Sequence, residues 1–551
     1  MATRRKEAAA PPRGYRDLQD HMKALDEAGL LRVIDAPVNK DTEMHPLVRW
    51  QFRGGIPESE RKAFLFTNVT DSLGRHYDMP VLVGGLSATA EIYSVGMGVP
   101  VEEIGAVWDR AIANPVEPVT VTGAACQEVI VTGDDLRGEG KGLDALPVPI
   151  STPGYDSAPY LTATLVTTRN PETGTQNMGM YRAGLKAPDR LALRMVARPG
   201  GAEGALHWEL WKKRGEKMPV AIVLGAPPAV VYTSPQKLRV GQEEMHVAGG
   251  IAGAPIRQVK CVTNDIMVPA EAEIVVEGLV DIEYLEPEAP FAESHGYVAL
   301  EDFNTIVEVT AITRKKNAVF NSIISQLTPS ESSVVKRVAY EPLFMAHLRD
   351  HLGIKGIRKV YLHEPLTNLR CVVFLVFERG VPTTEIWRAL YGTASRQTII
   401  GKYVIALNED IDPENADAVF WSLAYRANPA LDVEILKHRR RYGTRDPRTG
   451  TDDSTLLIDA TLKADMPPVA LPKREYMEGA KVLWEKLGLP PLKPEAPWFG
   501  YSLGDWDDRW DAMAQRAVEG NYLENGRRSA QLRRNDVAPN TSIRDVLGDD
   551  W

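Results

Sequence analysis

The sequence contains only three cysteines in 551 residues, and none of its apolar runs approaches the length of a transmembrane helix. Cys126, Cys261 and Cys371 lie far apart, so they form neither a CxxC pair nor a disulfide framework. A reducing cytoplasm is therefore the expected compartment. Even the apolar run at residues 371–377 falls far short of the roughly 20 residues that span a bilayer. The first 13 residues have no apolar core of a signal peptide, and we expect a loose tail there.

The chain also lacks an excess of positive charge. It has 64 Lys and Arg against 74 Asp and Glu, a formal net charge of −10. This balance argues against a general nucleic-acid-binding protein, which is usually basic. Hydrophobic residues make up 44% and charged residues 25%, which is typical of a globular protein with a large core. At roughly 150 residues per domain, the length suggests three or four domains.

Several common catalytic motifs are absent. There is no GxxxxGK[ST], no GxGxxG between a strand and a helix, no HExxH and no GxSxG. The sequence therefore gives no support to a P-loop site, a dinucleotide-binding Rossmann site, a zincin or a serine hydrolase. His347 and His351 are four residues apart on an expected helix, a spacing that can bind a metal. Without a third ligand, we interpret them as an ordinary histidine pair on a helix.

Hydrophobic periodicity divides the chain into regions of different character. Residues up to about 125 mix helix and strand patterns, residues 126–330 are rich in Gly, Pro, Val and Thr and read as many short strands, and α/β alternation returns from about 331. The last 60 or so residues contain Trp498, Trp506, Trp510 and Trp551, which could anchor a tail on the body or on a neighbouring subunit. The main expected helices cover residues 14–29, 101–114, 340–352, 383–392 and 416–426. The main expected strands cover residues 160–168, 220–224, 272–286, 306–313, 359–363, 371–377 and 404–407.

Three segments contain candidate chemical groups. The first is NMGMYR at residues 177–182, the second begins at Glu244, and the third is EPEAPFAESHGYV at residues 286–298. The third segment holds Glu288 and Glu293 among prolines that a central strand does not tolerate. We therefore expect a bent loop that projects carboxylates. Considered alone, such an acidic cluster is more typical of a solvated surface.

The ordered set of motifs resembles the UbiD family of decarboxylases that use prenylated FMN. The resemblance covers roughly residues 40–470. The matching motifs are NMGMYR at 177–182, PPA at 227–229, EMHVAGGIAGAPI at 244–256, VPAEAEIVVEG at 268–278, the E-x4-E pair Glu288/Glu293, NEDID at 408–412 and LLIDATLK at 456–463. One such motif would be weak evidence, but the set in this order is specific.

The resemblance implies an α/β multidomain fold. Residues 1–125 would form an N-terminal α/β domain, and residues 126–330 a central split β-barrel that binds the prenylated flavin. Residues 331–490 would form a C-terminal α/β domain. Residues 491–551 would be a Trp-rich tail for packing or oligomerisation. Family members are commonly homodimers or larger homo-oligomers.

The resemblance also implies a catalytic triad of Arg182, Glu288 and Glu293. A guanidinium is well suited to hold a substrate carboxylate. Glu288 would be the ionised partner of the buried Arg182, and Glu293 would be the general acid that protonates the carbon after CO2 leaves. The prenylated flavin would act as the electron sink. The competing interpretation of these three residues is an ordinary interdomain salt-bridge network.

Cofactor and metal ligands are implied in the same way. A divalent metal, Mn2+ in family members, with K+ nearby, would bridge the flavin phosphate to the protein through oxygen-rich ligands. Asn177 and Glu244 match two metal ligands, but the usual histidine is missing. His207 takes that role if residues 197–206 bulge, and otherwise it is a helix-surface residue. Further residues implied in cofactor binding are Met180, Tyr181, Arg182, Ser234, Pro235 and Lys402. Ala289 and Ala292 replace the glycines that the family usually has beside the two acids.

The resulting hypothesis is a reversible non-oxidative decarboxylase of an aromatic or heteroaromatic carboxylic acid. It would exchange CO2, depend on a flavin prenyltransferase for its cofactor, and bind neither nucleic acid nor membrane. Three alternatives remain open: a decarboxylase of α,β-unsaturated, cinnamate-like acids, a non-catalytic subunit of a larger carboxylase, and a conventional oxidoreductase with unmodified FMN. The identity of the bound flavin separates the last of these from the main hypothesis.

Overall fold

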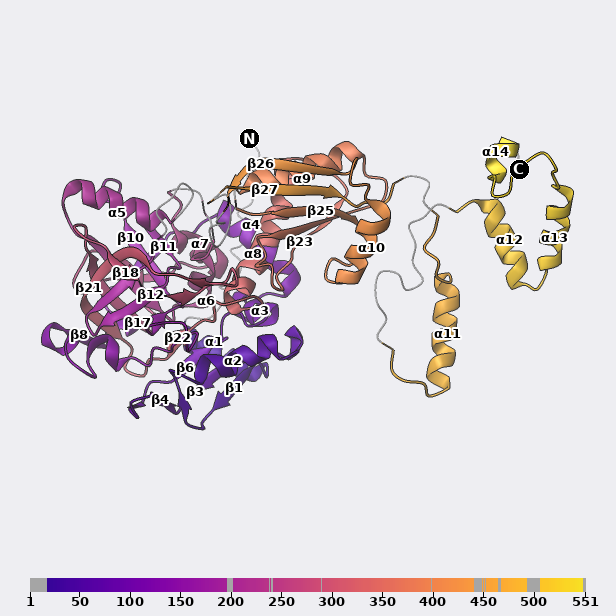
Figure 1. The fold of residues 1–551 in the computed structure, drawn as a ribbon. Helices are drawn as coiled ribbons and strands as arrows, with labels where there is room; N and C mark the ends of the chain where they lie inside the picture. Colours follow the sequence, from indigo (N-terminus) through magenta and orange to yellow (C-terminus); the bar gives the residue numbers. More distant parts are fainter. Residues whose placement is uncertain are drawn as a thin grey trace, which may run out of the picture. The chain divides into compact units, whose positions relative to one another are not determined.

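The computed structural model describes residues 17–195, 202–236, 238, 241–288, 290–397, 399–440, 448, 450, 452–463, 467–492 and 506–548. These residues form a mixed α/β multidomain fold, which confirms the predicted fold class (Figure 1). They divide into two compact units. The first comprises the described residues up to Phe377 together with Val381–Ala406 and Pro429–Asp459, and the second comprises Glu378–Gly380, Leu407–Asn428 and the described residues from Ala460 onward. The four domain boundaries expected from the sequence stay a prediction.

The N-terminal part of the first unit holds two small sheets and four helices. The sheets have the orders β1-β3-β6-β22 and β2-β4-β5. Their strands are β1 (Leu31–Ile34), β2 (Val38–Asn39), β3 (Ala63–Phe66), β4 (Val69–Thr70), β5 (His76–Tyr77), β6 (Val81–Val83) and β22 (Phe320–Ser322). The helices are α1 (Leu18–Glu27), α2 (Met44–Arg53), α3 (Ala90–Met97) and α4 (Ile104–Ala113). Strand β22 enters this sheet from far along the chain, beside β6.

The sequence explains where helix α1 begins and where it ends. Asp17 caps the helix by accepting the Asp20 backbone N–H at 2.8 Å, and Leu18, Met22 and Leu25 form its buried face. Gly29 follows the helix with φ +67°, a left-handed conformation that glycine adopts without strain. The expected helix and its stop at Gly29 are confirmed.

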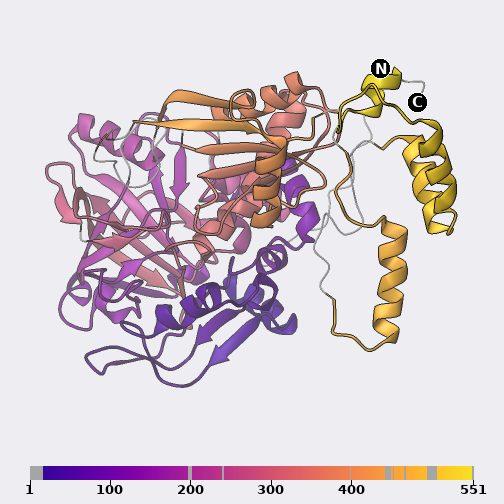
Figure 2. The same ribbon diagram turned by 45° about the vertical axis from the view of Figure 1, so that its right-hand side comes forward.

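A ten-stranded sheet forms the centre of the first unit. Its main path is β11-β10-β14-β17-β21-β13-β12-β9, with β8 and β18 also paired to β21. The strands are β8 (Val129–Thr132), β9 (Tyr160–Leu161), β10 (Leu165–Arg169), β11 (Gln176–Gly179), β12 (Ala183–Ala187), β13 (Arg190–Leu193), β14 (Met218–Leu224), β17 (Ile274–Val280), β18 (Glu286–Glu288) and β21 (Asp302–Arg314). Helices α5 (Glu203–Arg214), α6 (Pro228–Thr233) and α7 (Glu244–Ala252) belong to the same region (Figures 1 and 2). Shorter strands nearby are β7 (Val119–Thr120), β15 (Arg257–Lys260), β16 (Met267–Pro269), β19 (Phe291–Ala292) and β20 (Val298–Ala299).

Strand β21 is the element on which this sheet is organised. Its 13 residues pair with β18 at 302–304, with β13 at 305–308, with β17 at 307–314 and with β8 at 311–314. All four pairings are antiparallel. Because one strand fixes the register of four others, side chains from residues 190–194 and 286–288 are brought beside residues 302–308.

Two strand expectations differ from the structure. The expected strand at 160–168 is interrupted between β9 and β10, because Thr162 Oγ1 accepts the Ile323 N–H at 3.0 Å and Thr164 Oγ1 donates to the Tyr181 carbonyl. The expected strand at 272–286 ends at Val280, and β18 begins separately at Glu286. Within the acidic cluster at 286–298, β18 is an edge strand rather than part of a loop.

The C-terminal part of the first unit contains a five-stranded sheet of order β23-β24-β25-β27-β26. Its strands are β23 (Ile357–Leu362), β24 (Val372–Phe377), β25 (Tyr403–Asn408), β26 (Val433–Arg440) and β27 (Asp452–Asp459). Helices α8 (Glu331–Ala346) and α9 (Thr383–Arg396) belong to this region. Helix α8 begins nine residues before the expected 340, because Ser330 and Ser333 form a capping box. His347 and His351 lie in the helical turn that follows α8, with ring centroids 6.1 Å apart.

The second unit contains helix α10 (Ala416–Arg426) and helices α11 (Arg474–Lys486), α12 (Asp508–Val518), α13 (Tyr522–Gln531) and α14 (Ile543–Leu547). Arg426 and Asp410 form a buried bidentate ion pair with N–O distances of 2.8 and 2.5 Å. In the tail, the Trp506 and Trp510 rings lie 5.4 Å apart, and Trp498 and Trp551 lie outside the described residues. None of the helices described here has both the length and the hydropathy to cross a bilayer.

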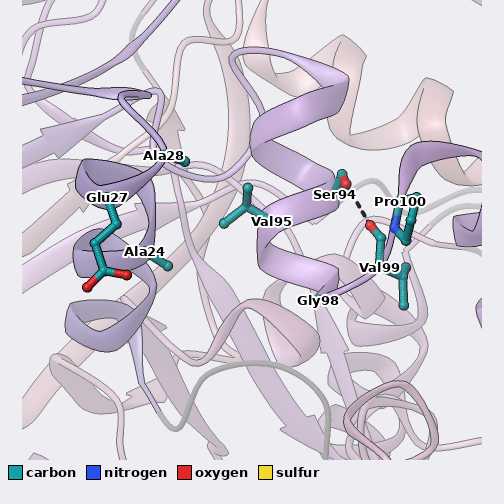
Figure 3. Close-up of a pocket in the computed structure, with 8 residues that line it drawn as sticks. All are labelled: Ala24, Glu27, Ala28, Ser94, Val95, Gly98, Val99 and Pro100. Atoms are coloured by element: carbon teal, nitrogen blue, oxygen red, sulfur yellow. Dashed lines mark hydrogen bonds between the residues drawn. The ribbon is translucent and has the colours of Figure 1, made fainter.

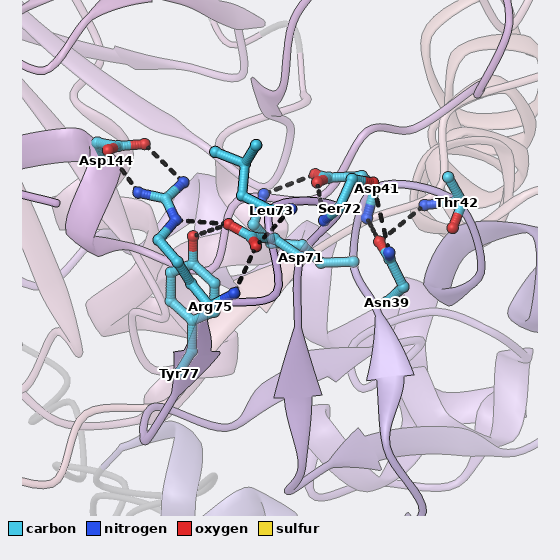
Figure 4. Close-up of polar contacts among 10 residues, drawn as sticks. Asn39, Asp41, Thr42, Asp71, Ser72, Leu73, Arg75, Tyr77 and Asp144 are labelled. Carbon is cyan, nitrogen blue, oxygen red and sulfur yellow. Dashed lines mark hydrogen bonds and ion pairs between the residues drawn. The ribbon is translucent and has the colours of Figure 1, made fainter. Parts of the chain in front are cut away.

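A polar network connects the β4–β5 hairpin to the segment near residue 144 (Figure 4). Asp71 accepts the backbone N–H of Arg75 at 2.9 Å, the Nε–H of Arg75 at 2.7 Å and the hydroxyl of Tyr77 at 3.0 Å. Arg75 then reaches Asp144 with its other two nitrogens, at 2.6 and 3.1 Å. Burial alone would raise the pKa of Asp71, but the hydrogen bonds from Arg75 and Tyr77 outweigh it and lower that pKa to about 2.

We predict that Asp71→Asn lowers the free energy of unfolding by about 2 kcal/mol at neutral pH, because it removes an ionised acceptor of charged hydrogen bonds. The folded-state pKa lies below the ordinary value of 3.8, so this contribution is present above that value and is lost as the pH falls toward 2. Urea unfolding of both proteins between pH 7 and pH 3 measures the difference. Asp134→Asn, at an exposed position, is the control. If the free energies of unfolding of the wild type and Asp71→Asn differed by the same amount from pH 7 to pH 3, the prediction would be contradicted.

Candidate active site

Arg182 lies at the entrance to the β12–β13 hairpin. It directly precedes β12, and its carbonyl accepts the Arg194 backbone N–H at 3.2 Å, just beyond β13. Leu193 is paired with Thr305 of β21. Arg182 and Arg194 are therefore placed at the same end of two adjacent strands, where β21 begins.

Glu288 and Glu293, which lie beside Arg182, come from two different elements of the chain. Glu288 lies on β18 opposite Asp302 of β21. Glu293 lies in the turn between β19 and β20, where its N–H donates to the Tyr297 carbonyl at 3.1 Å. The structure thus brings together Arg182, Glu288 and Glu293, as the family resemblance implied.

The guanidinium of Arg182 is held by both acids. Its Nε donates to Glu288 Oε1 at 2.6 Å, its Nη2 donates to Glu288 Oε2 at 2.8 Å, and its Nη1 donates to Glu293 Oε1. The Arg182 side chain is 8% exposed and that of Glu288 is 1% exposed, whereas that of Glu293 is 27% exposed. A bidentate, buried pair fixes the guanidinium, and the third contact joins it to the one acid that reaches solvent.

Other side chains complete this network. Asn304 donates its amide N–H to Glu288 Oε2 at 3.0 Å, and Arg194 Nη1 lies 3.6 Å from the same oxygen. Burial alone would lower the pKa of Arg182, but the hydrogen bonds and charges of Glu288 and Glu293 outweigh it and raise that pKa. The guanidinium therefore stays charged at all ordinary pH values.

Aromatic rings cover the guanidinium. The Arg182 carbon Cζ lies 4.8 Å from the centre of the Phe291 ring and 6.0 Å from that of Tyr160, and the two rings are 4.3 Å apart. Burial, with the charge of Glu288, raises the pKa of Tyr160 beyond its ordinary range. Tyr160 is therefore a neutral phenol at physiological pH, and the site combines an apolar wall with one fixed cation.

Asp156 holds the strand that leads to Glu293. Its carboxylate accepts the Ala292 N–H at 3.0 Å and the Thr152 N–H at 2.7 Å. Burial raises the pKa of Asp156 to about 6, against these hydrogen bonds and the charge of Arg182. Ala292, one of the two positions where the family usually has glycine, is buried in this arrangement. Ala289, the other, lies outside the described residues.

The three expected metal ligands are gathered around one point of the β10–β11 pair. Asn177 of β11 is paired with Thr168 of β10, and the Thr168 hydroxyl lies 2.9 Å from His207 Nδ1. Met178, the residue after Asn177, donates its N–H to Glu244 Oε2 at 2.8 Å. Asn177, His207 and Glu244 thus approach the same short stretch of backbone from β11, α5 and α7.

His207 is 3% exposed, so the alternative that it is a helix-surface residue is wrong. Burial lowers the pKa of His207 to about 4. The imidazole is therefore neutral at pH 7, as a metal ligand must be, and its Nδ1 is oriented by Thr168. Residues 197–201, half of the segment expected to bulge before His207, lie outside the described residues, and the part from Glu203 onward belongs to helix α5.

Glu244 carries a charge that burial disfavours. It begins α7 and is 7% exposed. Burial raises the pKa of Glu244 to about 8 despite the Met178 hydrogen bond, and the charges of Glu203 and Glu243 act in the same direction. A bound cation would keep such a carboxylate ionised, so this donor set of carboxylate, amide oxygen and imidazole suits a divalent metal. Within the described ranges, no group of three or more His, Cys, Asp and Glu side chains forms a metal site by itself.

The expected cofactor residues fall into two places. Met180 and Tyr181 lie between Asn177 and Arg182 and pack on the core, and Asn177 donates an amide N–H to the Tyr181 hydroxyl at 3.5 Å. Ser234 and Pro235 follow α6. Ser234 is 5% exposed, and its hydroxyl has no hydrogen-bond partner among the described residues. A buried hydroxyl without a partner is unfavourable, and a bound polar group would satisfy it.

Lys402 is placed elsewhere. It precedes β25 in the five-stranded sheet, and its ammonium lies 3.0 and 3.1 Å from the carboxylate oxygens of Asp453. The structure gives it no contact with the other expected site residues among those described. Its role in cofactor binding stays a prediction.

A pocket of about 550 Å³ between α1 and α3 is separate from this network (Figure 3). It is lined by Ala24, Glu27, Ala28, Ser94, Val95, Gly98, Val99 and Pro100. Glu27 is its one ionisable side chain, and none of the expected site residues lines it. It therefore offers no arrangement for acid–base chemistry.

Matches to known families agree with the geometry. The N-terminal, Rift-related and C-terminal domain models of 3-octaprenyl-4-hydroxybenzoate carboxy-lyase match residues 22–112, 118–327 and 335–460. Together these ranges cover most of the chain. The chain belongs to the UbiD family, and its expected assignment to UbiD-type carboxy-lyases is confirmed.

Solved structures of UbiD-class enzymes have the same fold. HmfF from Pelotomaculum thermopropionicum in complex with FMN is 26% identical, with 84% of this chain and 99% of that chain covered and a TM-score of 0.73. An evolved dimeric form of the same enzyme in complex with prFMN gives 26% identity, coverages of 83% and 97% and a TM-score of 0.71. Vanillic acid decarboxylase from Sedimentibacter hydroxybenzoicus, at 21% identity and coverages of 86% and 99%, gives a TM-score of 0.71, which shows the shared fold.

We predict that Glu288→Gln lowers the free energy of unfolding by about 3 kcal/mol, because it leaves the buried guanidinium without its bidentate partner. Glu286→Gln on the same strand is the matched control. Its partner Arg190 is 37% exposed, so the expected cost is below about 1 kcal/mol. Urea unfolding followed by tryptophan fluorescence measures both. If both variants lost the same free energy of unfolding, the Arg182–Glu288 pair would contribute no more to stability than an exposed ion pair.

Proposed function

We propose that this chain is a prenylated-FMN-dependent, reversible, non-oxidative decarboxylase of an aromatic or heteroaromatic carboxylic acid. The observation that supports it most is the buried Arg182, fixed by Glu288 and joined to the partly exposed Glu293 beside two aromatic rings. Two neighbours of the same class, HmfF in complex with FMN and its evolved dimeric form in complex with prFMN, have a flavin bound. Prenylated FMN would supply the electron sink for the loss of CO2.

Arg182 would bind the substrate carboxylate. A guanidinium has five N–H groups, and the contacts to Glu288 and Glu293 use three of them. Two N–H groups are therefore left for a substrate oxygen. Glu288, held also by Asn304 and Arg194, would keep the guanidinium in one orientation while the substrate binds.

Glu293 would be the proton donor. A substrate carboxylate held by the two remaining N–H groups of Arg182 would lie beside Glu293, which would act in its protonated form as the general acid. When the bond from the ring carbon to the carboxylate breaks and CO2 leaves, that carbon takes the proton of Glu293. Because its side chain is 27% exposed, Glu293 can regain a proton from solvent. Carboxylation is the same sequence reversed.

Asn177, His207 and Glu244 would hold a divalent metal, Mn2+ by family resemblance, with K+ nearby. Ser234 and Pro235 would contact the cofactor phosphate group, and Met180 and Tyr181 its ring system. The buried Ser234 hydroxyl and the raised pKa of Glu244 support this placement, because each is satisfied by a bound charged group. A flavin prenyltransferase would supply the cofactor, and the functional assembly would be a homodimer or larger homo-oligomer.

The three alternative functions differ from the proposed one in what an experiment would show. A cinnamate-like substrate would use the same three residues, so only a substrate screen separates it. A non-catalytic subunit has no need for a proton donor beside a fixed guanidinium, so the intact network argues against it. A conventional oxidoreductase would release plain FMN and change its redox state when substrate is added.

The test is to produce the protein together with a flavin prenyltransferase. We expect a released small molecule with the mass of prenylated FMN and CO2 release from aromatic acids. Glu293→Gln is expected to keep the flavin but lose CO2 release and hydrogen–deuterium exchange at the substrate carbon, since it removes the proton donor. Exposed Glu301→Gln is the control. Plain FMN with redox turnover, or full activity of Glu293→Gln, would contradict the proposal.

For the metal, we predict that Glu244→Gln lowers Mn2+ retention by roughly 10- to 100-fold, because a neutral amide replaces a charged ligand. Glu209→Gln, an exposed change on the helix of His207, is the matched control and is expected to retain Mn2+ normally. Metal content after gel filtration, measured by mass spectrometry, gives the comparison. Unchanged retention in Glu244→Gln would remove this residue from the metal site.

A further inference from the structure

The turn that carries Glu293 is held by side chains at both of its ends. Ala292, the residue before Glu293, donates its N–H to the carboxylate of Asp156 at 3.0 Å. Ser294, the residue after Glu293, accepts a hydrogen bond on its carbonyl from the side-chain amide of Asn368. The backbone on either side of the acid is therefore fixed by a residue that lies outside the turn.

Asn368 belongs to the loop between β23 and β24, whose backbone is in an unfavourable conformation at three positions. The angle φ is +63° at Leu366, +57° at Asn368 and +43° at Leu369. Asparagine tolerates this left-handed region, but leucine is disfavoured there because its Cβ crowds the backbone. Asn368 is 5% exposed and Leu369 is 1% exposed, so these are positions inside the protein. Such conformations persist only where surrounding contacts enforce them, and they gather at functional sites.

Contacts with the segment before α8 hold this loop in its conformation. The Thr328 hydroxyl donates to the Glu364 carbonyl at 2.6 Å and accepts the Asn368 backbone N–H at 3.2 Å. The Thr328 carbonyl accepts the Leu366 N–H at 3.2 Å. The Glu364 carboxylate in turn accepts the hydroxyl of Ser333 on α8. These contacts fix the backbone of the loop, and with it the direction of the Asn368 side chain, from the side of α8.

The turn around Glu293 has few contacts of its own. The Glu293 N–H donates to the Tyr297 carbonyl at 3.1 Å, and the Gly296 N–H donates to the Glu293 carbonyl at 3.0 Å. The flanking strands β19 and β20 pair over only two residues each. A hairpin this short is not stable by itself, so contacts from outside decide where the turn lies. They therefore also decide whether the Glu293 carboxylate stays at Arg182, whose Nη1 donates to it.

We propose that Asn368 is a positioning residue for the decarboxylation, because through the Ser294 carbonyl it holds Glu293 at the place from which Glu293 protonates the substrate carbon. This inference rests on the proposed function. Asparagine suits the position in two respects: it tolerates a left-handed φ, and its amide donates to a carbonyl. An aspartate would tolerate the same backbone, but its ionised carboxylate has no proton to donate.

The test compares changes within one loop of the cofactor-loaded protein. Asn368→Gly removes the amide donor, while glycine accepts the φ of +57° without strain. Leu366→Gly is the matched control, since it relieves the strain at a φ of +63°, keeps the amide and lies at a position that is 55% exposed. Asn368→Asp, which keeps the size of the side chain, is the second variant if Asn368→Gly does not fold.

The first measurement is the steady-state rate of CO2 release from an aromatic acid that the wild type decarboxylates. In Asn368→Gly and Asn368→Asp we expect kcat to fall roughly 10- to 100-fold, because a proton donor displaced by about 1 Å is much less effective. KM is expected to change less than about threefold, because Arg182 still binds the carboxylate. Leu366→Gly is expected to keep both constants within about twofold. A raised KM with unchanged kcat, or an equal loss in Leu366→Gly, overturns the inference.

The second measurement needs no turnover. Amide hydrogen exchange of residues 291–299, followed by mass spectrometry, is expected to be about tenfold or more faster in Asn368→Gly than in the wild type, whereas Leu366→Gly matches the wild type. Unchanged exchange in both Asn368 variants overturns the inference. If the wild type releases CO2 from none of the acids, the proposed function fails, and the exchange rates still decide whether Asn368 holds the turn.

Discussion

The buried pair of Arg182 and Glu288 is the interaction on which the rest of the site depends. A guanidinium that is 8% exposed and a carboxylate that is 1% exposed are each unfavourable without the other. Their bidentate contact sets the plane of the guanidinium, and that plane decides where Nη1 meets Glu293 and which face lies on Phe291. The position of the Arg182–Glu293 contact is thus set by the ion pair that Arg182 forms with Glu288.

The residues around this pair have separate tasks. Asn304 and Arg194 hold Glu288 from the sheet, and Asp156 holds the strand before Glu293 through the Ala292 N–H. Asn177, His207 and Glu244 gather at a different stretch of the same sheet, around residues 168 and 177–178. Such a division separates the groups that would handle the substrate from those that would hold a metal and phosphate, so each set can be altered without dismantling the other.

The sequence predicts the motif residues better than their supporting partners. Arg182, Glu288 and Glu293 lie in local patterns that identify them one by one, and the structure joins all three. Asp156, Arg194 and Asn304 show no local signal, because their contacts with Ala292 and Glu288 depend on how separate strands pair and not on a pattern along the chain. The same cause explains the interrupted strand at 160–168, where two threonine hydroxyls bond to distant backbone groups. Two acids of the expected strand 272–286, Glu273 and Glu277, are buried because Glu273 pairs with Lys315 and Glu277 accepts the Thr263 hydroxyl.

Strand β21 also constrains how this chain can vary. Side chains alternate between the two faces of a strand, so a slip of one residue moves every side chain to the opposite face. At residues 302–308 such a slip would turn Asn304 away from Glu288 and separate Arg194 from the acid that it contacts across the sheet. Many single replacements along β21 keep this geometry, whereas an insertion or deletion of one residue there does not. Apart from Asn304, the length of β21 is therefore under a stricter constraint than its composition.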